Sequence, residues 1–274
     1  MSTEIAMTIG YEGLQEDNAT VIERTFGDME RKIAAGDFSL KEKIALACRF
    51  LADEGHAMSL AGQISVRNDD GSFWTTGFAQ GFADTTADNL VRVNANLDVL
   101  EGDGMANPGA RFHSWIYAAR PDLRAIVHTH PPHASAIAMA GERLIISHMD
   151  MAMLHDEIAY LDRWPGVPLA NEEGEIISTA LGGKNAILLV NHGVLGAGAT
   201  LEEATFFLAS IEHAARMQLL CRGAGYQPIA VDDVLAADAK AFMTKPKFIQ
   251  ATFDYWCRQT LRRYPEVLES SRRG

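Results

Sequence analysis

The sequence predicts a single α/β domain in which a sheet lies between layers of helices. Three observations carry this prediction. Stretches rich in β-forming residues alternate with amphipathic helical stretches, two short apolar runs end in polar residues, and no internal repeat or low-complexity linker divides the 274 residues. We expect residues 1–38 to form an N-terminal arm, of which 1–20 are extended, residues 39–225 the core, and residues 226–274 a C-terminal helical tail.

The first half of the core contains a helix, two strand pairs and a second helix. Ser39 and Glu42 form a capping box for the first helix, and Gly55 is its stop signal. The β-rich segments are a hairpin at 62–77 with an Asp70-Gly71 turn and a strand pair at 89–104 with an Asp-Gly turn. Apolar residues at helical spacing in 112–123 predict the next helix, which ends before Pro121.

The second half contains two short buried strands followed by two helices. The strands are the apolar runs of LRAIVHTHPP (123–132) and ALGGKNAILLVNHG (180–193). The helices are an amphipathic stretch at 201–225, with acidic residues in its first turn and Arg222 at its close, and a final stretch at 247–268.

Composition excludes several classes of protein. Hydrophobic residues make up 47% and charged residues 22%, as in ordinary soluble domains. The balance of 24 basic and 36 acidic residues gives a net charge of −12, which argues against binding to nucleic acid or to anionic membrane. Three cysteines far apart form no C-x-x-C pair, so we expect free thiols. The acidic N-terminus is not a signal peptide, and no apolar window is long enough to span a membrane, so we expect a cytoplasmic protein.

Three histidines carry the clearest chemical signal. His128 and His130 are two residues apart on a predicted strand, so both imidazoles project from the same face and can bind one metal ion. His192, at the polar end of the second buried strand and beside Gly193, is the best candidate for a third ligand. The alternative is that these are structural histidines of a core or interface. There is no G-x-S-x-G nucleophile elbow and no G-x-x-x-x-G-K-[ST] phosphate loop.

Three segments together resemble the class II aldolase/adducin family. They are GQISVRNDDGSFWTTG at 62–77, RFHSWIYAARPDLRAIVHTHPPHASAIAMAG at 111–141 and ILLVNHGVLGAGATLEEATFFLASIEHAARMQL at 187–219. The resemblance implies a three-layer α/β/α subunit with a nine-stranded, mostly antiparallel sheet. It also implies a homotetramer of C4 symmetry with active sites between subunits, and a divalent metal ion bound by His128, His130 and His192. Adducin has lost these ligands, so their presence here favours an enzyme.

Two departures from the family pattern argue against a phosphorylated substrate. Sugar-phosphate aldolases of the family carry a Ser-Ser-Glu run, whose glutamate is the base, where this chain has Asn107-Pro108-Gly109. The Asn of the family's S-G-N segment is replaced here by Gln63. The candidate substrate-binding residues are those at these positions, those of the T-x-T-G turn, an arginine that could hold a carboxylate and a tyrosine of the tail that a neighbouring subunit could lend. They are Gln63, Thr76, Gly77, Asn107, Gly109, Arg111 and Tyr255.

These observations predict a metal-dependent carbon–carbon lyase for a small, non-phosphorylated hydroxy acid. Decarboxylation through a metal-stabilised enolate is preferred, because the leaving carboxylate supplies the electrons and no base is needed. Retro-aldol cleavage releasing an aldehyde is the alternative, and a non-catalytic adducin-like interaction module is the alternative of another class. Zinc is the expected ion, with manganese, cobalt, nickel or iron as alternatives. The candidate proton donors follow the metal pair: His133, His148, Asp150, His155 and Tyr160.

Overall fold

The computed structural model describes residues 16–167 and 171–268, and these form two units, one ending at Gly36 and the other beginning at Asp37. The first unit contains the helix α2 (Asn18–Lys32), which the sequence analysis did not predict. Residues 18–20 are its first turn and not extended chain, because the Asp17 carboxylate accepts the Thr20 N–H at 3.0 Å and caps the helix. The start of the predicted arm, residues 1–15, lies outside the described residues.

The second unit contains an eight-stranded sheet within the described residues, one strand fewer than the nine expected. The strand order is β4-β3-β2-β1-β5-β8-β7-β6, and only the pairing of β6 with β7 is parallel. The mostly antiparallel sheet is therefore confirmed. Its strands are β1 (Gln63–Arg67), β2 (Phe73–Thr76), β3 (Leu90–Val93), β4 (Val99–Glu101), β5 (Ala125–Thr129), β6 (Ile158–Leu161), β7 (Ala186–Leu189) and β8 (Val194–Gly198).

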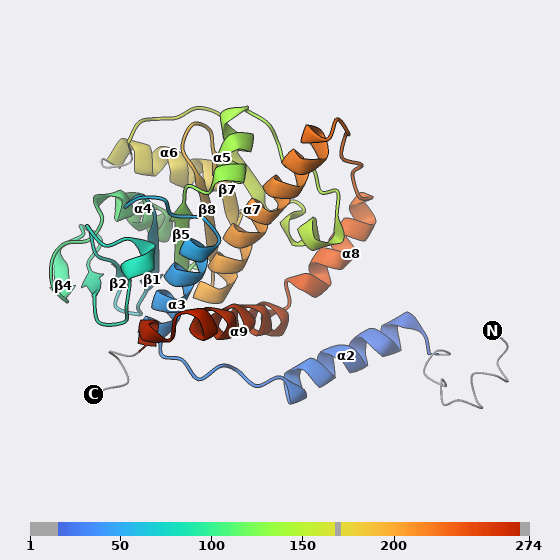
Figure 1. Cartoon of the computed structure of the whole chain (residues 1–274), viewed down its shortest axis with the longest axis horizontal. Coiled ribbons are helices and arrows are strands. Elements are labelled where there is room, and N and C mark those ends of the chain that lie inside the picture. The colour runs from blue at the N-terminus through green and yellow to red at the C-terminus, as the bar shows by residue number, and fades with distance from the viewer. Residues whose placement is uncertain (1–15, 168–170, 269–274) are drawn as a thin grey trace. The chain divides into compact units, whose positions relative to one another are not determined.

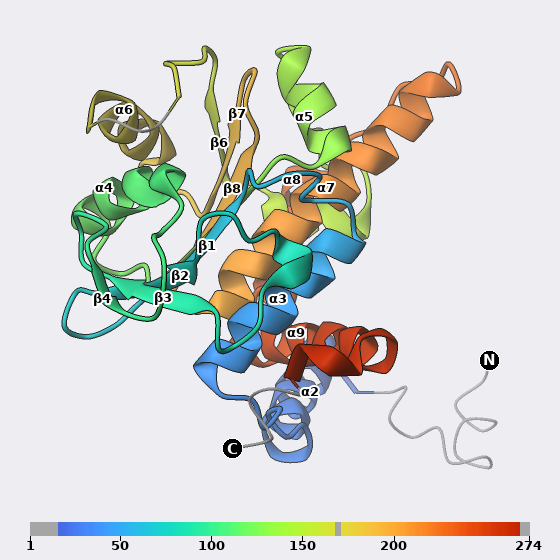
Figure 2. The same cartoon turned by 60° about the vertical axis from the view of Figure 1, so that its left-hand side comes forward.

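Helices cover both faces of this sheet, as Figure 2 shows edge-on. On one face lie α4 (Arg111–Ala119) and α6 (Asn171–Leu181), and on the other lie α3 (Leu40–Asp53) and α7 (Leu201–Gly223). The helix α9 (Pro246–Arg263) packs across α3 and α7 (Figure 1). Each face has its own apolar core, so the three-layer α/β/α architecture is confirmed.

The remaining elements complete the second unit. They are α5 (Pro132–Met139), α8 (Asp233–Met243) and the 3₁₀ turns η2 (Phe82–Asp84), η3 (Pro108–Ala110), η4 (Met149–Leu154) and η5 (Pro265–Leu268). The three cysteines are free, as expected. None of the helices in the described part of the chain is long and apolar enough to cross a membrane.

Most elements with a strong sequence pattern form as predicted. The capping box of Ser39 and Glu42 is present at the start of α3, and the Asp70-Gly71 turn joins β1 to β2. The turn between β3 and β4 was assigned wrongly. Asn94 and not Asp-Gly makes it, because the Asn94 side chain accepts the N–H groups of Asn96 and Asp98.

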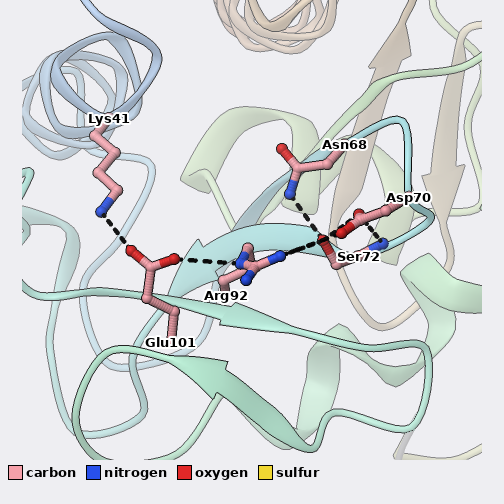
Figure 3. A network of polar contacts seen from close by, with 6 residues as sticks. All are labelled: Lys41, Asn68, Asp70, Ser72, Arg92 and Glu101. Atoms are coloured by element: carbon pink, nitrogen blue, oxygen red, sulfur yellow. Dashed lines mark hydrogen bonds and ion pairs between the residues drawn. The ribbon is translucent and has the colours of Figure 1, made fainter.

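A polar network fixes the two hairpins to each other (Figure 3). The Arg92 guanidinium on β3 lies 3.2 Å from Asp70 Oδ2 in the β1–β2 turn and 3.4 Å from Glu101 Oε2 on β4. The ammonium of Lys41 on α3 lies 3.4 Å from the other oxygen of Glu101. These ion pairs are exposed and add little free energy individually, so their contribution is to hold the register of this end of the sheet.

Candidate metal centre

The end of β5 and the turn between β7 and β8 bring the three predicted histidines to the same end of the sheet. His128 lies on β5 and His130 directly follows it, while His192 lies in the turn between β7 and β8. Because β8 pairs with β5, with Thr129 opposite Val194, that turn lies against the end of β5. A Cβ at Gly193 would come within 2.4 Å of the Thr129 carbonyl oxygen and of the His130 ring, so only glycine allows this close approach.

The three imidazoles converge on one point. Their ligand nitrogens lie within 4.8 Å of one another, and the Nε2 atoms of His128 and His130 are 3.1 Å apart. Two ligands about 2.1 Å from a tetrahedral ion lie about 3.4 Å apart, so this spacing is close to that of a metal site. The Val194 carbonyl accepts the Nδ1–H of His128 at 2.9 Å, which orients the ring and leaves Nε2 free as a ligand.

Burial keeps these imidazoles in the neutral form that binds metal. It lowers the pKa of His192 to about 4, with a further contribution from nearby His130, and lowers the pKa of His128 well below its usual value. Burial also lowers the pKa of His130. His128 is fully buried whereas His130 and His192 are partly exposed, so the cluster is closed on the sheet side and open on the other. Three neutral nitrogens with an open side fit a catalytic divalent ion.

Several of the predicted substrate-binding residues lie beside this cluster. Gln63 begins β1 and is the antiparallel partner of His128. An isolated β-bridge joins Gly77, directly after Thr76, to Ala106 and so places the T-x-T-G turn beside Asn107. Asn107 itself has a structural role, since its amide donates to the Leu60 carbonyl at 3.0 Å and accepts the Gly109 N–H at 3.0 Å.

Three other candidates line a separate groove of about 540 Å³ between α3, α7 and α9. They are His133, Asp150 and Tyr255, and none of the three clustered histidines lines this groove. His133 Nδ1 lies 2.6 Å from Glu212 Oε1, which also accepts the backbone N–H of His133, and Glu212 Oε2 accepts the backbone N–H of Ala134. Glu212 thereby caps α5 and orients the His133 ring.

The remaining candidates take part in hydrogen bonds with other parts of the chain or with their own turn. His148 accepts the Asp150 N–H and caps η4, and the Tyr160 hydroxyl accepts the Leu144 N–H at 3.1 Å. The carbonyl of His155 accepts a hydrogen bond from Lys240 Nζ at 2.9 Å. Arg111 donates to the Ala95 carbonyl and to the side chains of Asn96 and Asn171, so it ties the β3–β4 turn to α6.

Sequence reasoning missed two buried residues, one that supports the histidine cluster and one that orients His133 in the groove. The carbonyl of His56 accepts the His130 N–H, and its ring lies 3.0 Å from the hydroxyl of Thr129. A lone histidine before a loop gives no signal of this role. Glu212 could have been found, because it is an acid four residues after Leu208 on the buried face of a long helix, where a charge requires a partner.

Comparisons with known proteins agree with this geometry. The model of the class II aldolase and adducin N-terminal domain matches residues 42–219. Decarboxylase NovR of Streptomyces niveus is 31% identical over 191 residues, which cover 68% of this chain and 71% of NovR. Alpha-adducin of Rattus norvegicus is 31% identical over 192 residues, which cover 67% of this chain and 26% of adducin. The solved L-fuculose 1-phosphate aldolase of Glaciozyma antarctica PI12 aligns with a TM-score of 0.75 and 29% identity, over 83% of this chain and 90% of that chain.

Proposed function

Because the chain belongs to the class II aldolase and adducin family, we propose that it is a divalent-metal-dependent carbon–carbon lyase. Its substrate in this proposal is a small, non-phosphorylated hydroxy acid, and the preferred reaction is decarboxylation. Similarity to a decarboxylase and to a solved aldolase supports a lyase-like role. Similarity to alpha-adducin supports the alternative of a non-catalytic interaction module.

The observation that carries the proposal is the convergence of His128, His130 and His192. An interaction module has no use for three neutral imidazoles with their nitrogens turned toward one another, because withdrawing these ring nitrogens from water costs free energy. A bound divalent ion, with zinc preferred, would act as a Lewis acid and stabilise negative charge on a substrate oxygen.

The reaction preference rests on the residues beside the cluster. Gly109 supplies no carboxylate where family aldolases have their base, and Asn107 is engaged with the Leu60 carbonyl. Retro-aldol cleavage needs a group that removes the hydroxyl proton, whereas decarboxylation starts without one. The surroundings of the cluster therefore favour loss of carbon dioxide.

The groove supports the proposed homotetramer with shared active sites. His133, Asp150 and Tyr255 line it with Glu212, and none of the three metal-binding candidates of the same chain does. In the proposed assembly this groove faces the metal cluster of a neighbouring subunit. One of these side chains would then give a proton to the carbon left by carbon dioxide.

Metal analysis of three proteins tests the proposal. The wild-type protein should bind one transition metal ion per chain, and His130→Ala should bind less than a tenth of this, because two imidazoles do not retain the ion. His148→Ala is the matched control for metal content, since it removes an exposed histidine outside the cluster. Wild-type protein without metal, or His130→Ala with full metal, would support the adducin-like alternative.

A panel of hydroxy-keto acids and hydroxy-substituted aromatic acids, whose keto group or ring accepts the electrons left by carbon dioxide, separates the two lyase reactions. Metal-loaded wild-type protein should release carbon dioxide without aldehyde. Aldehyde without carbon dioxide would show that retro-aldol cleavage is the correct assignment.

A further inference from the structure

The side chain of Gln63 occupies the space that Gly109 leaves free. A Cβ at position 109 would lie 2.9 Å from Gln63 Nε2 and 3.2 Å from Gln63 Cδ. Both distances are shorter than the usual separation of non-bonded heavy atoms. A side chain at 109 and the present carboxamide position therefore exclude each other. The two departures from the family pattern, which are far apart in sequence, form one structural unit.

The carboxamide of Gln63 lies on the same face of the sheet as the His128 imidazole. Gln63 and His128 are directly opposed in the antiparallel pairing of β1 and β5. Side chains of opposed residues point to the same face, with Cβ atoms about 5 Å apart. Gln63 is thus a neighbour of the candidate metal centre.

The side-chain oxygen of Gln63 forms no hydrogen bond within the described part of the chain. The side chain is only 5% exposed, yet Oε1 has no hydrogen-bond partner among the described residues. A buried acceptor without a partner lowers the stability of the folded protein, because it has lost its hydrogen bonds to water. A native protein retains such a group where a catalytic or binding role, or a bound water or ion, accounts for it.

Two more unsatisfied polar atoms lie on the same side of the sheet. They are Thr75 Oγ1 and His113 Nε2, both buried and without a partner in the part of the chain that the structure describes. Both residues adjoin Ser65, which is two positions along β1 from Gln63. Thr75 is the strand partner of Ser65, and the Ser65 hydroxyl lies 2.7 Å from His113 Nδ1. The face beside His128 is therefore polar and incompletely bonded, as expected of a binding site.

We propose that Gln63 Oε1 accepts a hydrogen bond from the substrate hydroxyl beside the three histidines, and that Gly109 is required to admit this carboxamide. The inference rests on the proposed lyase function, which supplies the hydroxy acid. A carboxamide oxygen accepts a hydrogen bond but is not a base, so it holds the hydroxyl proton in place where a glutamate would remove it. The Gln63–Gly109 pair is then a specificity determinant that favours decarboxylation over retro-aldol cleavage.

Binding of 2-hydroxyisobutyrate, a hydroxy acid with no keto group to support cleavage, tests the contact without turnover. Calorimetry on the metal-loaded full chain should show affinity roughly two- to tenfold weaker for Gln63→Met, the loss of one hydrogen bond. Metal content should be unchanged. The unfolding midpoint of the ligand-free variant should equal or exceed that of wild type, because methionine fills the same space without the unsatisfied oxygen. Unchanged affinity together with a lower midpoint would show that Gln63 is structural.

A double-mutant cycle tests the role of Gly109. Gly109→Ala should displace the carboxamide and weaken binding in the wild-type background, but should have no further effect in a Gln63→Ala background. Gly183→Ala is the control and should leave affinity unchanged, since a Cβ there meets nothing within 4 Å. Equal effects of Gly109→Ala in both backgrounds would overturn the pairing. If wild type binds no hydroxy acid, the proposed function fails and this inference with it, whereas unchanged affinity across the variants overturns this inference alone.

Discussion

Ser65 is the centre of a buried polar chain between β1 and α4. Its hydroxyl lies 2.7 Å from His113 Nδ1 and 2.8 Å from the Tyr117 hydroxyl, and all three residues are buried. Burial lowers the pKa of His113 to about 3 and raises that of Tyr117, so both side chains are neutral near pH 7. The serine therefore joins two neutral groups that have lost their contact with water.

Replacing Ser65 with alanine should destabilise the protein by about 1–3 kcal/mol, because His113 and Tyr117 each lose a buried partner. Urea unfolding measures this change. Ser135→Ala is the matched control, since the Ser135 hydroxyl is also buried but has no partner among the described residues. Its removal from the helix α5 should be neutral or stabilising. Similar losses for the two variants would contradict the hydrogen-bonded role of Ser65.

At the residue scale, the sequence predicts neighbours only where the spacing along the chain determines them. His128 and His130 share a face because they are two positions apart on a strand, and His192 joins them because it ends a second buried strand. The candidate proton donors have no such constraint. His133 and Asp150 both line a groove formed by helices that are distant in sequence, so no local pattern indicates their place.

At the element scale, the strand β8 shows why some structure was not predicted. Its sequence Val194–Gly198 contains two glycines, which are unfavourable in strands and indicate a turn. The structure uses them for packing: a Cβ at Gly196 would lie 2.3 Å from the Ala204 carbonyl oxygen, and a Cβ at Gly198 would lie 2.7 Å from Glu203 Cβ. The glycines let α7 approach the sheet, a requirement that appears only when the two elements are in contact.

Gly196→Ala should therefore destabilise the protein by several kcal/mol, because the clash is with the backbone of α7, which cannot move without separating from β8. Thermal unfolding of the ligand-free protein measures the loss. Gly223→Ala, at the last residue of the same helix, serves as the control, since a Cβ there meets nothing within 4 Å. An unfolding midpoint for Gly196→Ala equal to that of the control would show that α7 packs less closely than described.

At the scale of the whole molecule, the fold was more predictable than the arrangement of the candidate site. Three ordered motifs identify the layered fold, and the antiparallel pairing of β5 with β1 and β8 is what brings His128, Gln63 and Val194 together. The Gln63–Gly109 contact was not predictable. Each residue appeared in the sequence as a separate departure, and only the packing of η3 against β1 shows that one compensates for the other.

Stability in acid is a property of the whole molecule. Outside the metal cluster, we expect two buried histidines to determine most of its dependence on pH. Burial lowers the pKa values of His56 and His113 to about 3 in the folded protein, whereas histidine in an unfolded chain has a pKa near 6.5. Between these values the unfolded chain binds protons that the folded chain does not. The free energy of unfolding should therefore decrease as the pH falls from about 6.5 toward 3, and be unaffected by these groups above that window.

Urea unfolding of the metal-free protein between pH 7 and 4 measures this dependence. His113→Gln removes one of the two groups, so its stability should fall less steeply with decreasing pH than that of wild type, even if it is less stable at pH 7. His213→Gln, which replaces an exposed histidine on α7, is the control for the substitution itself. If His113→Gln and wild type have the same slope, His113 binds its proton in the folded protein over the same pH range as in the unfolded chain, and burial does not keep it neutral in acid.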